Sequence, residues 1–289
     1  MLRFDNGFLR KLEYLRVVSR RAFMGHDRAD RIATKRGRGL EFADHRQYSP
    51  GDDVRHIDWK AYKRLNRLLL RLFDEEQDLS IYLFLDASQS MANDGKFEQA
   101  KRIAAALCYI GLVHLDRVTI VPFGARLQLE TVAGRGRARI FQVFAALDRV
   151  ATAGQTSLVQ AFTQFASTSR PRGLAIVISD FLDPAGIEAG LKVLSRTRHD
   201  VCAVYVTSAQ EPAIGALGEI RCVDAETGEV RDIDVTAGLA KAYREAWQAH
   251  ALAIEQCCKR WQVAYVRANA EDPLEDVMLR TFRQGGFVA

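Results

Sequence analysis

Three oxygen-bearing side chains, Asp86, Ser88 and Ser90, stand at alternate positions of one short segment. This segment directly follows the apolar run 79–85, which has the composition of a buried strand. One carboxylate and two hydroxyls in a tight loop can converge on a single cation, and such hard donors suit Mg²⁺ or Mn²⁺ rather than zinc or copper. The two serines could instead cap a following helix, so this loop alone leaves both interpretations open.

Two further oxygen-bearing residues are expected at the same place in the fold. Thr156 precedes a helical pattern at 158–165, and Asp180 follows the apolar run 174–178. Because the carboxyl ends of parallel strands meet at one edge of a sheet, these loops should lie beside the first one. The predicted metal ligands are Asp86, Ser88, Ser90, Thr156 and Asp180, with Mg²⁺ or Mn²⁺ as the ion.

The elements that must position these loops alternate along the chain. Apolar runs predict buried strands at 79–85, 118–123, 174–178, 201–206 and 263–266. Helical spacing of apolar residues predicts helices at 8–23, 96–115, 140–147, 158–165, 187–194 and 237–260. Strands that are apolar on both faces and separated by helices predict a doubly wound α/β domain with a mostly parallel sheet, which is a Rossmann-like arrangement.

The remaining segments have weaker patterns. The residues at 40–60 form a turn-rich stretch, and the apolar run 68–73 could be a strand beside 79–85. A short exposed strand is expected at 126–131 and a polar hairpin around Thr227 and Gly228. We therefore expect an N-terminal helix and charged collar at 1–78, the α/β domain at 79–270 and a C-terminal helix or tail at 271–289.

The positive charge of the chain is concentrated at its N-terminal end. Residues 1–78 hold 18 Lys and Arg against 13 Asp and Glu, whereas the other 211 residues hold 23 of each. This basic extension could attract an acidic protein surface, nucleic acid or anionic lipid, or it could simply be a solvated helical face. Its aromatic residues are not interleaved with the charges in a stacking pattern, so nucleic acid is not the expected partner.

The combination Asp-x-Ser-x-Ser, Thr and Asp on a doubly wound sheet resembles the metal-ion-dependent adhesion site of the von Willebrand factor A domain. The resemblance covers about 190 residues, and Asp86, Ser88, Ser90, Thr156 and Asp180 match its motif positions. It implies that these residues hold Mg²⁺ directly or through water. It also implies that an acidic side chain of a partner protein completes the coordination.

The segment before this domain carries a second set of motifs. Gly37–Phe42, Arg46–Asp53 and Arg55–Trp59 resemble the signature of a bacterial family of unknown function in which a von Willebrand A-like domain follows. Members are typically encoded beside MoxR-type AAA+ ATPases, which implies such an ATPase as a partner. From the residues themselves, the segment could be a salt-bridged structural collar or a binding surface.

Several enzyme classes lack their motifs here. Gly95-Lys96 is not part of a phosphate-binding loop, and neither a nucleophile elbow nor a His-Glu-x-x-His zinc motif occurs. An aspartate after a strand could serve as a phosphotransfer nucleophile, but Ser88 stands where such hydrolases carry their general acid. No catalytic residues and no organic cofactor are predicted.

These observations predict a non-enzymatic adaptor that acts with a MoxR-type ATPase and an acidic client protein in protein maturation or complex assembly. The alternatives are a magnesium-dependent phosphohydrolase, or binding of nucleic acid or membrane by the basic N-terminus. Five scattered cysteines, the lack of a signal-peptide pattern and the lack of a long apolar run predict a cytoplasmic protein without transmembrane segments.

Overall fold

The structure is a computed structural model that describes residues 12, 41–49, 54, 57–74, 80–128, 131–197, 199–211 and 217–278. It divides into two compact units, one of residues 23–78 and the other of residues 1–22 and 79–289. The predicted helix at 8–23 lies outside the described residues except for Leu12, which is helical and buried. The motif residues 37–40, 50–53 and 55–56 also lie outside them.

The smaller unit contains a two-stranded antiparallel ribbon and one short helix. Strand β1 (Glu41–Gln47) pairs with β2 (Leu69–Asp74), and α3 (Trp59–Leu65) lies between them in the sequence. Asp58 begins the helix, because its Oδ1 accepts hydrogen bonds from the N–H groups of Lys60 and Ala61 at 2.9 and 3.0 Å. The stretch at 40–60, expected to be rich in turns, holds a strand at 41–47 and the start of a helix at Trp59, while residues 50–53 of its turn signal lie outside the described residues.

The larger unit is built on a six-stranded sheet with the order β10-β7-β6-β3-β4-β5. Its strands are β3 (Ser80–Asp86), β4 (Arg117–Phe123), β5 (Thr131–Gly134), β6 (Gly173–Ser179), β7 (Asp200–Thr207) and β10 (Ala264–Asn269). All neighbours are parallel except β4 and β5. The predicted doubly wound, mostly parallel α/β fold is confirmed.

Two strand predictions are corrected by this sheet. The strand predicted at 68–73 pairs with β1, whereas the neighbours of β3 are β4 and β6. The strand expected at 126–131 begins later, as β5 at 131–134. Among the described residues before it, Leu127 forms an isolated bridge with Phe123, and the N–H of Gln128 donates to Pro122 O at 2.8 Å.

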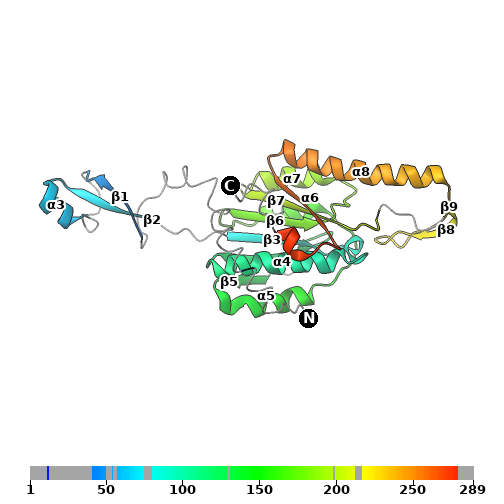
Figure 1. Ribbon diagram of the computed structural model, residues 1–289, viewed down its shortest axis with the longest axis horizontal. Helices are drawn as coiled ribbons and strands as arrows, with labels where there is room; N and C mark the ends of the chain where they lie inside the picture. The colour runs from blue at the N-terminus through cyan, green and yellow to red at the C-terminus, as the bar shows by residue number, and fades with distance from the viewer. Residues whose placement is uncertain are drawn as a thin grey trace. The chain divides into compact units, whose positions relative to one another are not determined.

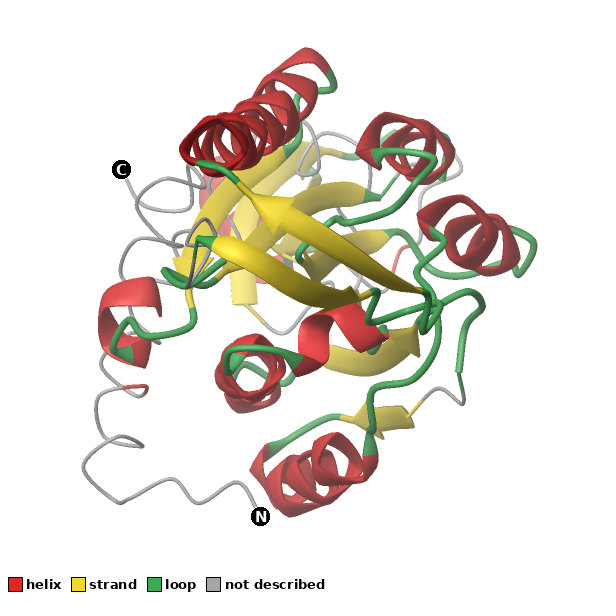
Figure 2. Cartoon of the chain, turned by 90° about the vertical axis from the view of Figure 1, so that its right-hand side faces the viewer, coloured by secondary structure: helices red, strands yellow, loops and turns green. Residues whose placement is uncertain are grey.

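Helices cover both faces of the sheet (Figures 1 and 2). The helices α4 (Lys96–Val113) and α5 (Ile140–Arg149) lie on one face, and α6 (Leu158–Ala166), α7 (Ile187–Ser195) and α8 (Ala237–Arg260) lie on the other. These helices confirm the predicted ones. Helix α4 approaches the sheet closely at Gly111, where an added Cβ would lie 2.7 Å from Ile81 Cδ1.

The second face also carries the aromatic core. Phe84 of β3 packs edge-to-face against Phe162 and Phe165 of α6, with ring centroids 5.3 and 4.8 Å apart. Burial of these rings fixes β3 against α6 and so fixes the loops that follow both β3 and α5.

A polar hairpin of β8 (Gly218–Val223) and β9 (Val230–Val235) precedes α8, as the sequence predicted. Figure 1 places this hairpin at the end of the unit toward which β3 and β6 run. At the chain end, residues 274–278 are helical and the residues after 278 lie outside the described part. None of the helices in the described residues is both long enough and apolar enough to cross a bilayer.

Candidate metal centre

Backbone hydrogen bonds hold the predicted site loops together at the carboxyl edge of the sheet. The N–H of Gln89 donates to Gly154 O at 2.9 Å, and the N–H of Ala153 donates to Ala87 O at 2.8 Å, which joins the loop after β3 to the loop before α6. Strands β3 and β6 pair in parallel up to Leu85 and Ile178, so Asp86 and Ser179 follow side by side. The structure thus brings all three predicted loops to one place.

Asp86 lies at the centre of these loops and is completely buried. Its Oδ1 accepts the backbone N–H of Ser88 at 2.9 Å, and its Oδ2 accepts the hydroxyl of Ser179 at 2.5 Å. Thr156 Oγ1 lies 3.4 and 3.5 Å from the two carboxylate oxygens. The hydroxyls of Ser88 and Ser90 are 3.0 Å apart.

The electrostatic surroundings of Asp86 disfavour its charge. Burial and the nearby charge of Asp180 raise the pKa of Asp86 from 3.8 to about 7, although hydrogen bonds from Ser179 and Ser88 act in the opposite direction. A cation at this place would relieve both unfavourable effects on the charged form of Asp86. It would replace the hydration lost on burial and offset the repulsion by Asp180.

Asp180 is also completely buried, but it faces a cation of the chain itself. Lys96 Nζ donates to Asp180 Oδ2 at 2.8 Å and to Glu211 Oε1 at 2.5 Å, and the lysine is only 2% exposed. Burial lowers the pKa of Lys96, but the charges of Asp180 and Glu211 outweigh that effect and raise it. Asp180 Oδ1 accepts the N–H of Leu182 at 3.2 Å.

Sequence reasoning missed Lys96, Ser179 and Glu211. Lys96 opens α4, where the helix dipole disfavours a positive charge, and this unusual position was the available signal. Ser179 directly precedes Asp180 in the sequence, so its place at the sheet edge could have been predicted. Glu211 carries no signal, because it follows β7 by a few residues and reaches Lys96 from 115 positions along the chain.

The chemistry of the donor set fits a hard divalent cation. The five predicted residues supply two carboxylates and three hydroxyls, all with oxygen donors and all buried. Within the described residues, no group of three or more His, Cys, Asp or Glu side chains stands in a metal-binding arrangement. Hydroxyls and retained waters would therefore have to complete the coordination, which suits Mg²⁺ better than a metal that needs nitrogen or sulfur ligands.

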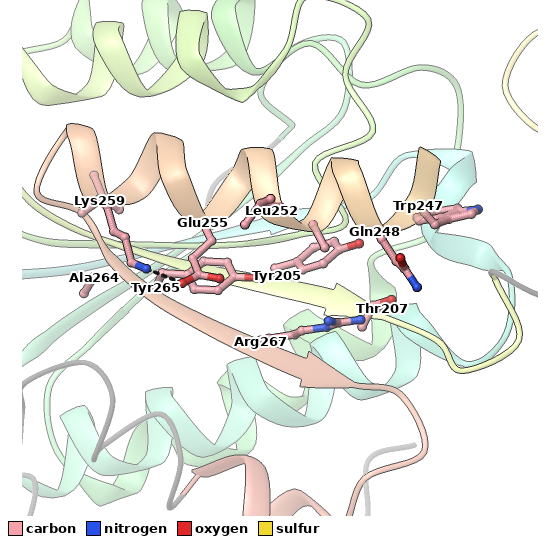
Figure 3. A pocket seen from close by; sticks show the side chains of 12 residues that line it. Tyr205, Thr207, Trp247, Gln248, Leu252, Glu255, Lys259, Ala264, Tyr265 and Arg267 are labelled. Carbon is pink, nitrogen blue, oxygen red and sulfur yellow. Dashed lines mark hydrogen bonds and ion pairs between the residues drawn. The ribbon is translucent and has the colours of Figure 1, made fainter. Parts of the chain in front are cut away.

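A groove of about 880 Å³ lies between α8 and the strands β7 and β10 (Figure 3). Its aromatic and charged lining includes Tyr205, Trp247 and Arg267. The ring of His250 packs edge-to-face on Tyr205 and Trp247, and its Nε2 lies 3.3 Å from Asp180 O. His250 therefore contacts both the lining of the groove and the backbone of Asp180.

Comparisons with known proteins identify relatives by sequence. The family model "Protein of unknown function DUF58" matches residues 44–254. An uncharacterised protein of Mycobacterium tuberculosis strain H37Rv is 26% identical over 246 residues, which cover 83% of this chain and 77% of that protein. An uncharacterised protein of Mycobacterium bovis matches with the same figures.

Solved structures resemble the fold at a lower level. BatB from Bacteroides thetaiotaomicron has a TM-score of 0.44 and 14% identity, over 72% of this chain and 98% of that one. An aerotolerance-related membrane protein from Bacteroides fragilis has a TM-score of 0.43 and 15% identity over the same shares. Likeness at this level carries no argument about function. The family match spans most of the chain, and the protein therefore belongs to the DUF58 family of unknown function.

Proposed function

We propose that this protein is a non-enzymatic adaptor that binds a partner protein through a divalent cation at the carboxyl edge of its sheet. One observation carries the proposal: five buried, oxygen-bearing residues from three loops, Asp86 among them, gather at the carboxyl edge of the sheet. Backbone hydrogen bonds join the loop after β3 to the loop before α6, and the hydroxyl of Ser179 joins the end of β6 to Asp86, so the donors are held in place before any cation arrives. Such preorganisation lowers the cost of binding.

Each residue of the centre has a proposed role toward Mg²⁺ or Mn²⁺. Asp86, Ser88 and Ser90 would hold the ion from the first loop, with Thr156 and Asp180 on its other sides. Ser179 orients Asp86 through its 2.5 Å hydrogen bond. The bound cation would supply an electrophilic position for an anionic oxygen.

A carboxylate of a partner protein is the proposed ligand for that position. The resemblance of the five residues to the adhesion site of von Willebrand factor A domains supports this choice. Asp86 and Asp180 supply two negative charges to a divalent ion, which leaves the ion able to attract a further acidic group. A single contact of this kind adds specificity to an interface but needs surrounding contacts to give stable binding.

A MoxR-type AAA+ ATPase and an acidic client protein are the proposed partners, in protein maturation or complex assembly. The support is the resemblance of the motifs at 37–59 to a family encoded beside such ATPases, together with the family match of this chain. The basic N-terminal region would attract an acidic surface on either partner.

The experiment measures binding of the full chain to the neighbouring MoxR-type ATPase, and to candidate clients, in Mg²⁺ and in EDTA. The double variant Ser88→Ala with Ser90→Ala should bind in Mg²⁺ as weakly as the unchanged protein does in EDTA. Ser157→Ala is the matched control, because its hydroxyl only caps α6 at Gln160 N. Equal binding in all conditions would contradict the proposal, and turnover of a phosphate ester dependent on Asp86 would favour the phosphohydrolase instead.

A further inference from the structure

Glu226 lies in the turn of the β8–β9 hairpin, and the turn is fixed from within. Asp224 Oδ1 accepts the backbone N–H groups of Glu226 and Thr227 at 2.9 and 2.7 Å. Gly228 follows with a φ of 71°, a conformation that glycine adopts without strain. The position of Glu226 is therefore set by the backbone and is not that of a loose loop side chain.

The carboxylate of Glu226 has an unusual environment for a hairpin tip. Its Oε1 is buried, and no hydrogen-bond donor in the described part of the chain satisfies it. A buried carboxylate oxygen without a partner is costly, and a native structure rarely retains one without a use. A cation is the simplest group that would satisfy it.

The neighbours of Glu226 are residues of the candidate metal centre. Burial and the negative charge of Asp180 raise the pKa of Glu226, and the backbone N–H of Thr156 acts in the opposite direction. Two of the five predicted ligands therefore lie near this side chain. Figure 1 agrees, since the hairpin lies at the end of the unit where the site loops gather.

We propose that Glu226 is a further carboxylate of the metal centre, supplied by the hairpin, on the side of the cation that would receive a partner. This inference rests on the proposed function. In the described residues Asp86, Asp180 and Glu226 do not stand in a three-carboxylate metal-binding arrangement, so the hairpin turn would have to move toward the centre when the cation binds. A dication would offset the mutual repulsion of Asp86, Asp180 and Glu226, which Lys96 alone does not balance.

This arrangement gives the protein a built-in competitor for its partner. A partner carboxylate has to displace Glu226 before it reaches the cation. Partner binding is thereby restricted to acidic groups that are also supported by surrounding contacts, which raises selectivity at the expense of affinity.

The experiment titrates the full chain with Mg²⁺ by calorimetry and follows amide hydrogen exchange of residues 218–235. We expect Glu226→Gln to weaken Mg²⁺ binding roughly tenfold, the size of effect seen when groups that support a metal site are removed. Mg²⁺ should slow exchange in the hairpin of the unchanged protein and not in the variant. The variant should fold normally in EDTA, because it loses a charge that the nearby charge of Asp180 disfavours.

Two control variants separate a specific role from general electrostatics. Glu229→Gln changes an exposed carboxylate of the same hairpin that pairs with Arg231. Asp183→Asn removes a charge at the same sheet edge, where Asp183 accepts the N–H of Leu158 at 2.7 Å. If Glu226→Gln binds Mg²⁺ as these controls do, the role of Glu226 is overturned and the proposed function stands. If the unchanged protein binds no Mg²⁺, both proposals fall.

Discussion

The candidate metal centre contains two buried carboxylates that the fold treats in opposite ways. Asp86 is surrounded by hydroxyl and backbone N–H donors, so it is solvated without a neutralising charge. Asp180 instead forms an ion pair with Lys96, which is itself held by Glu211. Both side chains end neighbouring parallel strands, yet one is left in need of a cation and the other already has one.

This difference suggests how a site can be preformed and still respond to an ion. The Lys96 ion pair keeps the loop after β6 in position when no metal is bound, while Asp86 remains the stronger attraction for an incoming dication. Neither carboxylate alone would both hold the loop in place without metal and attract the ion. A centre whose carboxylates are all paired would reject the ion, and a centre with only unpaired carboxylates would disfavour folding.

The largest effect should follow from removal of the internal cation. Lys96→Met leaves the buried carboxylates of Asp180 and Glu211 without their cation, and we expect the free energy of unfolding to fall by about 3–5 kcal/mol. Lys259→Met is the matched control, since that lysine pairs with Glu255 on the exposed surface of α8 and should cost less than about 1 kcal/mol. Chemical denaturation in EDTA measures the free energy of unfolding of both variants. Equal losses would show that the buried and the exposed ion pair contribute equally to stability.

A smaller effect should appear as a pH dependence that belongs to Asp86. Its pKa in the folded protein is about 7, above the value of 3.8 for a solvated aspartate, so the folded state binds the proton more tightly. The free energy of unfolding in EDTA should therefore decline by about 3–4 kcal/mol as the pH rises from 4 to 7, and should level off above 7.

Asp86→Asn tests the origin of that decline, because the amide keeps the shape and cannot ionise. The variant should lose most of the decline, whereas Asp183→Asn should retain it. Unfolding midpoints in denaturant at several pH values provide the measurement. An unchanged slope in Asp86→Asn would assign the pH dependence to another group.

The smallest effect should come from the hydroxyl of Thr156. Its distances to Asp86 are 3.4 and 3.5 Å, whereas the Ser179 hydroxyl lies at 2.5 Å. Without metal, Thr156→Val should change the free energy of unfolding by less than about 1 kcal/mol, and Ser179→Ala should cost about 1–3 kcal/mol because a buried acceptor loses its donor. Thermal denaturation of the two variants in EDTA measures which substitution costs more stability. A larger loss of stability for Thr156→Val than for Ser179→Ala would contradict the prediction.

Sequence reasoning succeeded where burial dictates composition. Strands β3, β6 and β7 are apolar on both faces, and α8 was predicted with its observed ends, Ala237 and Arg260. It failed for β1 and α3, because a small two-stranded ribbon next to a short helix buries too little to impose a clear apolar pattern.

In the candidate site, too, some residues could be predicted from the sequence and others could not. The five predicted residues could be found because each follows or precedes a recognisable element, and topology alone brings such positions together. Glu211 and Glu226 could not be found in this way, since their roles depend on contacts between distant segments. Charged residues also occur on every exposed face, so their type alone does not single them out.

The separation of the site loops in the sequence has a consequence for biosynthesis. The hydrogen bond from Ser179 to Asp86 joins residues 93 positions apart, and it forms only when β6 pairs with β3. Pairing of distant parallel strands is slow, because the intervening chain has to be closed first. A ribosome-bound chain that ends before β6 therefore holds Asp86 without Ser179, Asp180 or the Lys96 ion pair. Uptake of a cation at this edge would accordingly signal that β6 has paired with β3.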